Sequence, residues 1–289
     1  MSKLKLFNTI GKKNGIYQLD ITNFKSTKSE KTRPFLRYPG SKYNACKYIS
    51  PFWENICFDE YREPFLGSGA VFFKMKKCKV NILNDLDKEL INCYEVLKDK
   101  KFLKQFKNDV ANIVPSKDWF NKLRNTSPKN SYQKALKYFL INRTAYSGIM
   151  NLPNWGYDEK RSVQPRKWPE RLEIAHEKLR ENVTLSSLHF KDVINKKSTN
   201  SVWMFIDPPY FKADQKRAYS KSFELKDHLE LVQLLKKTPH KFCLTYDNCE
   251  EIKELYNWAK IFEVEWMYHT ANSKVTSRKK GKELIIVNY

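Results

Sequence analysis

The chain has 289 residues, of which 41% are hydrophobic and 14% aromatic, so it is long enough to bury a large core and too apolar to be disordered. Its 54 Lys and Arg against 32 Asp and Glu give a net charge of +22, which indicates a polyanionic partner, nucleic acid ahead of an anionic membrane surface, unless it only reflects a Lys-rich proteome. The chain shows no signal peptide and no apolar segment as long as a membrane span, so we expect no membrane partner and a cytoplasmic location.

The N-terminal part of the chain is the least informative. Residues 1–33 are polar and Lys-rich, with one weakly strand-like piece, GIYQLDI, and they form an extension of unknown role. The next stretch, FLRYPGSK (35–42), is a Pro–Gly turn that ends in Lys42. Because it lacks the GxxxxGK[ST] phosphate loop, it does not predict a nucleotide triphosphate site. A surface turn with a solvated Lys is the alternative to a ligand contact.

Two strand–turn–helix units follow this turn. The stretch YREPFLGSGAVFFKMKK (61–77) predicts a strand end, a glycine turn and a helix that begins near Ala70. The stretch VNILNDLDKELINCYEVLK (80–98) predicts a strand at Val80–Leu83 and an amphipathic helix. Two such units in succession indicate an α/β protein with a parallel, doubly wound sheet.

Polar and small residues stand at the ends of these two strands. Gly67 and Gly69 in the first turn permit close backbone approach to a ligand. Asp85 ends the second strand, where an acid typically holds ribose hydroxyls. The alternative for Asp85 is a helix N-cap, a role that Asp87 could also take.

The alternation of predicted strands and helices is interrupted over residues 101–181 and then resumes. The break contains a helical stretch, SYQKALKYFLINRTAYSGI, and a loop-like one, NLPNWGYDEKRSVQPRKWPE. After it we predict the following elements: a further unit at 182–194, a strand at 202–206, a helix at 225–237, a strand at 241–248, a helix at 250–259, and a closing hairpin formed by IFEVEWMYH (261–269) and ELIIVNY (283–289).

The strand at 202–206 is followed by Asp207-Pro208-Pro209-Tyr210. The prolines donate no ladder hydrogen bond, so the strand stops at Asp207. Ligands of open α/β sheets bind beyond the carboxyl ends of strands, which makes this acid a candidate site residue. An ordinary proline turn after a strand is the alternative.

The six cysteines predict no metal site. They stand at positions 46, 57, 78, 93, 243 and 249, without a CxxC pair and without His at metal-ligand spacing. We expect reduced, buried thiols.

Seven stretches together resemble a known family. RYPGSK, EPFLGSGAVFF, NDLDKELIN, NRTAYSG, FIDPPYF, LTYDN and KGKELIIVNY occur in the order seen in Dam-like adenine-specific DNA methyltransferases, also called the D12 class, with the alpha order of motifs. The chain is similar to this family over residues 34–289. The resemblance implies a Rossmann-like methyltransferase sheet, S-adenosylmethionine as methyl donor, double-stranded DNA as partner, and methylation of N6 of a flipped adenine. It also implies a catalytic domain formed by residues 34–100 and 182–289, with residues 101–181 as an inserted, mainly helical target-recognition region.

The chemistry of the tetrapeptide fits this reaction. The adenine amino group is flat and weakly nucleophilic, because its lone pair is delocalised into the ring. Acceptors for its two hydrogens let electron density build on the nitrogen, and the Asp207 carboxylate and the Pro208 carbonyl supply them. Tyr210 offers a ring on which an extruded base stacks. The expected catalytic residues are therefore Asp207, Pro208, Pro209 and Tyr210.

The resemblance also implies the remaining site residues. Those expected at the cofactor, with Lys42 near its methionine carboxylate, Asp85 on the ribose and Phe190 near the adenine, are Tyr38, Lys42, Phe65, Gly67, Gly69, Asp85, Phe190 and Asp207. A core Phe is the alternative for Phe190. Those expected at DNA, by resemblance or as basic residues of the irregular and hairpin loops, are Asn142, Arg143, Tyr146, Arg166, Arg278, Lys279 and Lys280. A buried helix end is the alternative for the first three, a packed turn with a solvent-facing side chain for Arg166, and a solvated loop for the last three.

The segment after NRTAYSG departs from the family's GATC-methylating members. They continue with an Arg and a GxFNxPFG-like segment, where this chain reads NLPNWGYDEKRSVQPRKWPERL, so no GATC target is predicted. We expect a monomer, with a cognate restriction endonuclease as a further partner. The alternatives are transfer to cytosine N4, RNA or a protein amide, and, in another class, a non-catalytic DNA-binding protein.

Overall fold

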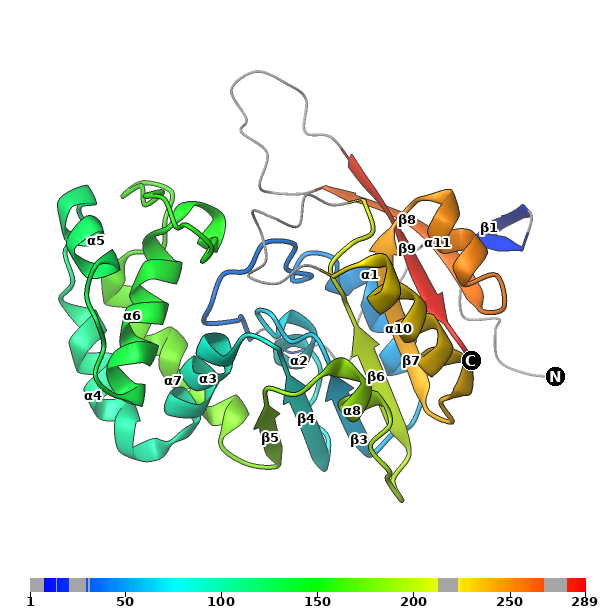
Figure 1. Ribbon diagram of the computed structural model, residues 1–289, viewed down its shortest axis with the longest axis horizontal. Helices are drawn as coiled ribbons and strands as arrows, with labels where there is room; N and C mark the ends of the chain where they lie inside the picture. Colours follow the sequence, from blue (N-terminus) through cyan, green and yellow to red (C-terminus); the bar gives the residue numbers. More distant parts are fainter. Residues whose placement is uncertain (1–7, 14, 21–29, 31, 213–222, 268–279) are drawn as a thin grey trace.

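One mixed β-sheet forms the centre of the protein (Figure 1). The computed structural model describes residues 8–13, 15–20, 30, 32–212, 223–267 and 280–289. Within them the sheet has nine strands in the order β1-β2-β8-β9-β7-β6-β3-β4-β5. The strands are β1 (Asn8–Lys13), β2 (Ile16–Asp20), β3 (Glu60–Glu63), β4 (Val80–Asn84), β5 (Val183–Ser186), β6 (Val202–Ile206), β7 (Lys241–Asp247), β8 (Lys260–Met267) and β9 (Lys280–Val287).

The strand directions bring the sequence motifs to one edge of the sheet. Strands β5, β4, β3, β6 and β7 are parallel to one another, whereas β9 runs antiparallel to both β7 and β8. The residues that follow β3, β4, β6 and β7 therefore lie at the same edge. They include the glycine turn, Asp85 and Asp207.

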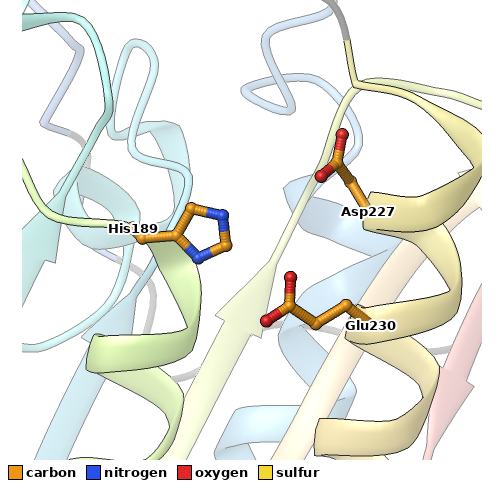
Figure 2. A group of neighbouring side chains, drawn as sticks. All are labelled: His189, Asp227 and Glu230. Atoms are coloured by element: carbon orange, nitrogen blue, oxygen red, sulfur yellow. The ribbon is translucent and has the colours of Figure 1, made fainter.

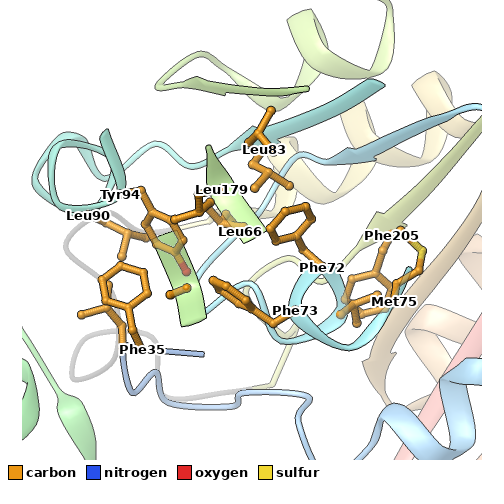
Figure 3. Close-up of a cluster of buried hydrophobic side chains, with 14 of the residues drawn as sticks. Phe35, Leu66, Phe72, Phe73, Met75, Leu83, Leu90, Tyr94, Leu179 and Phe205 are labelled. Carbon is orange, nitrogen blue, oxygen red and sulfur yellow. The ribbon is translucent and has the colours of Figure 1, made fainter. Parts of the chain in front are cut away.

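Helices cover both faces of the sheet, as expected for a doubly wound fold. Alternate residues of β6 pack into two clusters, because successive side chains of a strand point to opposite faces. Trp203 and Phe205 join side chains of α1 (Cys46–Glu54) and α2 (Ala70–Lys74). The other β6 residues join side chains of α8 (Phe190–Ile194), α10 (Leu225–Lys237) and α11 (Glu250–Leu255). Figure 3 shows part of the first cluster, which includes Phe72, Phe73 and Phe205.

The region 101–181 is mainly helical, as predicted, and forms a separate group of helices beside the sheet (Figure 1). Its elements are α4 (Lys100–Ala111), α5 (Lys117–Arg124), α6 (Ser131–Thr144), the short 3₁₀ helices η2 (Tyr146–Gly148) and η3 (Pro165–Lys167), and α7 (Trp168–Leu179). The helix α3 (Lys88–Lys98) packs against α6 and joins this group to the sheet. None of the helices in the described residues has the length and apolar character that a membrane span requires.

Several predicted elements are confirmed and three differ. The strands at 80–83, 202–206 and 241–248, the helix at 225–237 and the closing hairpin are present. The predicted helix over 131–149 ends at Thr144, since Ala145 is extended and pairs with Trp155 in an isolated bridge. The helix over 250–259 ends at Leu255. Residues 46–54 form a helix that the sequence pattern did not predict.

The described part of residues 1–33 is not separate from the sheet. β1 and β2 form an antiparallel hairpin, and β2 pairs in parallel with β8. Hence the segment that showed only one weakly strand-like piece extends the central sheet by two strands.

Candidate active site

A cavity of about 470 Å³ opens at the carboxyl ends of β3, β4 and β6. Seven of the eight residues expected at the cofactor line it: Tyr38, Lys42, Phe65, Gly67, Asp85, Phe190 and Asp207. The eighth, Gly69, is the N-cap of α2 directly behind the turn. The sequence motifs therefore converge on one pocket although they span about 170 positions of the chain.

The glycine turn after β3 has backbone conformations with positive φ, which residues other than glycine adopt only at a cost in free energy. Gly67 and Gly69 have φ angles of 49° and 64°. A Cβ atom on Gly67 would lie 3.0 Å from the ring of Tyr38, so the turn also needs the small residue for space. Tyr38 and the turn thus pack against each other along the pocket wall.

Asp85 connects the glycine turn to the end of β4. Its Oδ2 accepts a hydrogen bond from the backbone N–H of Gly67 at 2.8 Å, and its Oδ1 accepts one from the N–H of Asp87 at 3.0 Å. Burial raises the pKa of Asp85 to about 6. Asp87, and not Asp85, is the N-cap of α3, because its carboxylate accepts from the N–H groups of Glu89 and Leu90. The alternative of an N-cap is therefore correct for Asp87.

Asp207 stands immediately after β6 with one carboxylate oxygen held in place. The Lys42 Nζ lies 3.0 Å from its Oδ1, and the Thr245 hydroxyl donates to the same oxygen at 2.7 Å. Among the described residues, none hydrogen-bonds to Oδ2. The side chain is 20% exposed and lines the pocket, so Oδ2 is the oxygen with acceptor capacity left.

Lys42 and Tyr210 meet a second carboxylate that the sequence patterns did not indicate. The Tyr210 hydroxyl donates to Oε2 of Glu283 on β9, and Lys42 Nζ lies 3.9 Å from the same oxygen. Lys42 also lies over the Tyr210 ring, 4.8 Å from its centroid. Burial, with the charges of Glu283 and Asp207, raises the pKa of Tyr210 well above its usual value, so the phenol stays protonated. Instead of a solvated surface residue, Lys42 is a buried cation between two acids.

The turn after Asp207 is fixed by the end of the neighbouring strand. Asp247, the last residue of β7, accepts from the N–H groups of Phe211 and Lys212 at 3.0 and 2.9 Å. Since Pro208 and Pro209 have no N–H, these two hydrogen bonds are the backbone anchors of the turn that the structure shows. The predicted LTYDN strand thus contributes both Thr245 and Asp247 to the site.

Aromatic residues form the other end of the pocket. Phe65 and Phe190 stack with ring centroids 5.4 Å apart, and Phe223 meets the edge of Phe65 at 5.7 Å. All three line the cavity. Phe190 is also buried in the core beside α10, so its position agrees with both interpretations of the sequence.

A further acid at the pocket, Glu63, is the first residue of EPFLGSGAVFF but was not expected to be a site residue. Glu63 ends β3, lines the cavity and accepts a hydrogen bond from the Tyr61 hydroxyl at 2.8 Å. Burial raises the pKa of Glu63 well above its usual value. The signal in the sequence was weak, since Glu63 differs from an ordinary strand residue only by its place before the glycine turn.

Among the residues expected at DNA, Asn142, Arg143, Tyr146 and Arg166 are described, and none of these four lines the pocket. Asn142 is 1% exposed, and its side chain bonds to backbone groups of Arg37 and Gly148. Arg143 is buried as well, and burial beside Arg171 and Arg37 lowers its pKa to about 9. Tyr146, in contrast, is 43% exposed on η2. Both buried positions match the alternative of a helix end, and contact with DNA stays a prediction for them.

The basic residues expected at phosphates are only partly described. Arg166 is exposed on η3. Arg278 and Lys279 lie outside the described residues, and the backbone of Lys280 begins β9. Their contacts with DNA stay predictions.

Three polar side chains at the rim of the cavity point toward one another (Figure 2). The ligand-type atoms of His189, Asp227 and Glu230 lie within 4.8 Å of one another. Two of them serve helix starts: the His189 ring accepts from the N–H of Lys191, and Asp227 accepts from the N–H of Glu224 in the capping box of α10. In the part of the chain that the structure describes, no other observation at this group points to a cation.

Comparison with known sequences identifies a family, and the relatives that match include two of nearly the same length as this chain. The family model described as D12 class N6 adenine-specific DNA methyltransferase matches residues 38–270. The Type II methyltransferase M1.LlaDCHI of Lactococcus lactis subsp. cremoris is 25% identical over 281 residues, with 89% of this chain and 95% of the relative covered. The Type II methyltransferase M.MjaIII of Methanocaldococcus jannaschii is 25% identical over 291 residues, with 89% and 99% covered.

Solved structures show weaker likenesses. The rRNA methyltransferase aviRa from Streptomyces viridochromogenes has 12% identity and a TM-score of 0.30, with 79% of this chain and 75% of that chain covered. The methyltransferase yhhF from Escherichia coli has 10% identity and a TM-score of 0.32, with 89% and 98% covered. Likeness at these scores has no bearing on the function.

Proposed function

The chain belongs to the D12 class of N6 adenine-specific DNA methyltransferases. From this premise we propose that it methylates an adenine flipped out of double-stranded DNA at the pocket that Asp207 lines. It is an adenine-specific DNA methyltransferase that uses S-adenosylmethionine as methyl donor. The proposal concerns which residues carry out the reaction and how the target is chosen. Its main support is the carboxylate of Asp207, with Oδ1 held by two donors and Oδ2 left as an acceptor at the pocket.

The proposed role of Asp207 follows from hydrogen-bond capacity. An amino group conjugated with the adenine ring has two hydrogens and little basicity. Asp207 Oδ2 accepts one hydrogen and the Pro208 carbonyl oxygen accepts the other, so electron density returns to the nitrogen. Lys42 and Thr245 fix Oδ1, and so the carboxylate needs no reorientation when the base arrives. Asp207 Oδ2 then receives the proton that the nitrogen loses.

Tyr210 is proposed to stack on the flipped base. Its hydroxyl is engaged by Glu283, and its position directly after the two prolines restricts the backbone that carries the ring. Base-modifying enzymes read an extruded base by stacking and by hydrogen bonds to its edge. With Asp207 at the amino edge and Tyr210 at the face, the tetrapeptide provides both.

The residues of the pocket suit the methyl donor. The cavity combines an aromatic end, an acid at Asp85 and a glycine turn packed on Tyr38, which match an adenine, ribose hydroxyls and an amino-acid moiety. When bound, S-adenosylmethionine supplies an already activated methyl group. We propose that Phe65 and Phe190 contact its adenine, Asp85 its ribose, and Lys42 its carboxylate, with Tyr38, Gly67 and Gly69 shaping the wall. Lys42 would then serve this carboxylate and Asp207 at once.

The helical region 101–181 is proposed to choose the DNA target. Tyr146 and Arg166 are exposed there, and the basic residues near the β8–β9 turn would hold phosphates. The relatives' designation as Type II methyltransferases supports a place in restriction–modification, with a cognate endonuclease as the further partner. We also propose that the enzyme acts as a monomer in the cytoplasm, where its DNA substrate lies.

Mapping N6-methyladenine in the DNA of cells that express the protein tests this function. The expected result is one short methylated sequence in wild-type cells and none in cells with Asp207→Ala. Methylation of cytosine, or no modified base in DNA at all, would refute it.

A further inference from the structure

Three segments that are distant in the chain meet at one buried cation. Lys42 is 5% exposed, and its Nζ lies 3.0 Å from Asp207 Oδ1 and 3.9 Å from Glu283 Oε2. The same ammonium lies over the Tyr210 ring, whose hydroxyl donates to Glu283. Glu283 is itself 1% exposed on β9, between β7 and β8. Asp207, Lys42, Tyr210 and Glu283 thus form one connected group.

The burial of Glu283 requires an explanation. An ionised carboxylate is costly in the interior unless charged partners and hydrogen bonds compensate it. The contacts named above supply a cation and a hydroxyl, and both belong to residues of the proposed reaction. A strand that only completed the sheet would be more stable with an apolar side chain at this position, as at its neighbours Leu284 and Ile285, which are fully buried.

We infer that Glu283 is a positioning residue for methyl transfer, which aligns the Tyr210 ring through its hydroxyl and shares Lys42 with Asp207. This inference rests on the roles proposed above for Asp207 and Tyr210. Lys42 alone would neutralise Asp207. Counted as formal charges, Asp207, Glu283 and Lys42 sum to −1, a balance that favours the positive charge developing on the adenine nitrogen.

Two substitutions at Glu283 separate its two contacts. Glu283→Gln keeps the shape and an oxygen that accepts from Tyr210 but removes the charge near Lys42. Glu283→Ala removes both. Tyr210→Phe removes only the hydroxyl. The matched control is Glu263→Gln on the neighbouring strand β8, where the carboxylate pairs with Lys253 at the surface.

The experiment has two readouts. The first is the single-turnover methylation rate, and the second is the fluorescence of 2-aminopurine at the target position in DNA, which rises when the base leaves the stack and is recorded without cofactor. We expect Glu283→Gln to lower the rate about 10-fold with a wild-type fluorescence signal, since loss of a charged partner is worth about one such factor. Glu283→Ala should lower the rate about 100-fold and also change the fluorescence, as both interactions are removed. In the double variant with Tyr210→Phe the two effects should not add.

The outcomes distinguish this inference from the proposed function. Folded Glu283→Gln with wild-type rate, or effects at Glu283 and Tyr210 that simply add, would overturn the inference. If Glu283→Ala fails to fold, Glu283→Gln and Tyr210→Phe still decide it, because both conserve the size of the side chain. Asp207→Ala serves as the reference. If it retains activity, the proposed function itself fails, whereas an inactive Asp207→Ala beside a fully active Glu283→Gln refutes only the role of Glu283.

Discussion

At the scale of single residues, the two oxygens of Asp207 have different surroundings. Lys42 and Thr245 both engage Oδ1, which leaves Oδ2 for the amino group. We predict that Asp207→Ala lowers the single-turnover rate at least about 10²-fold, because removal of an aligned catalytic group costs several kcal/mol. Rapid quenching on a cognate duplex measures this, with DNA affinity as the control that should hardly change. A near-normal rate would exclude Asp207 from the reaction.

Asp85 gives a prediction about pH. Because burial raises its pKa to about 6, the carboxylate in the free protein is ionised near pH 7 and becomes neutral as the pH falls through 6. If the ionised form holds the ribose, affinity for S-adenosylmethionine should be about tenfold weaker at pH 5, where about a tenth of the molecules remain competent. Calorimetric titration between pH 5 and 7 measures the effect. Asp85→Asn should bind weakly at both values with a flat profile. The same slope in wild type and Asp85→Asn would remove this acid from the site.

The site residues that the sequence predicted and the one that it missed differ in how far apart along the chain their contacts lie. Gly67, Asp85 and Asp207 stand directly after strands, so their common edge follows from local pattern and the parallel order. Glu283 meets Tyr210 across 73 positions, and only the antiparallel insertion of β9 brings them together. The alternation of polar and apolar residues in KGKELIIVNY does not show whether its acid is buried or is an exposed residue at the start of an edge strand. Asn142 likewise stood in a stretch that matched the family, but its amide holds the loop of Arg37.

At the scale of elements, the turn after α6 depends on a close backbone approach. The N–H of Tyr146 donates to Asn154 and the N–H of Gly156 donates to Thr144, so the two segments lie side by side. A Cβ atom on Gly156 would lie 2.3 Å from Tyr146 Cα. This close approach sets the position of the exposed Tyr146 ring.

We therefore predict that Gly156→Ala displaces η2 and weakens DNA binding several-fold, with a decrease of about 1–3 kcal/mol in the free energy of unfolding from overpacking. Urea denaturation and DNA titration measure the two effects. The control is Gly15→Ala between β1 and β2, where φ is 81° and an added Cβ meets nothing within 4 Å. It should cost about 1–2 kcal/mol of backbone strain and leave DNA affinity unchanged. Unaltered DNA binding in Gly156→Ala would place Tyr146 away from the DNA.

The position of each strand in the sheet explains whether the sequence pattern predicted it. β4, β6 and β7 are nearly continuous apolar runs, as expected for strands buried on both faces. β1 is a polar strand at the edge of the sheet, and β2 lies between it and β8, a position that depends on pairing across about 245 positions. The short helix α2 begins at Ala70 as predicted, whereas α1 contains Pro51, which obscures its pattern.

At the scale of the whole molecule, the net charge of +22 and the helical region should contribute separately to DNA recognition. Neutralising Lys279 and Lys280 should weaken binding to all duplexes alike and reduce the slope of log affinity against log salt by about 1 for each ion pair with a phosphate that is removed. The methylated sequence should stay the same. Arg166→Ala should instead cost about 1–3 kcal/mol on the cognate site and relax one position of the target. Sequencing the methylated sites of both variants tests whether the basic residues and the helical region have these separate roles. A changed target in the Lys variant, or an unchanged target in Arg166→Ala, would contradict the separation.

The position of β9 also has a consequence for protein synthesis. This strand lies between β7 and β8 although it follows both of them in the chain. A nascent polypeptide translated only through β8 therefore holds the apolar strand β7 with one edge open, a state that invites chaperone binding. When the ribosome releases β9, the same pairing event closes the sheet and delivers Glu283 to Lys42 and Tyr210. A translation product that ends before β9 lacks Glu283 and therefore part of the group around Asp207.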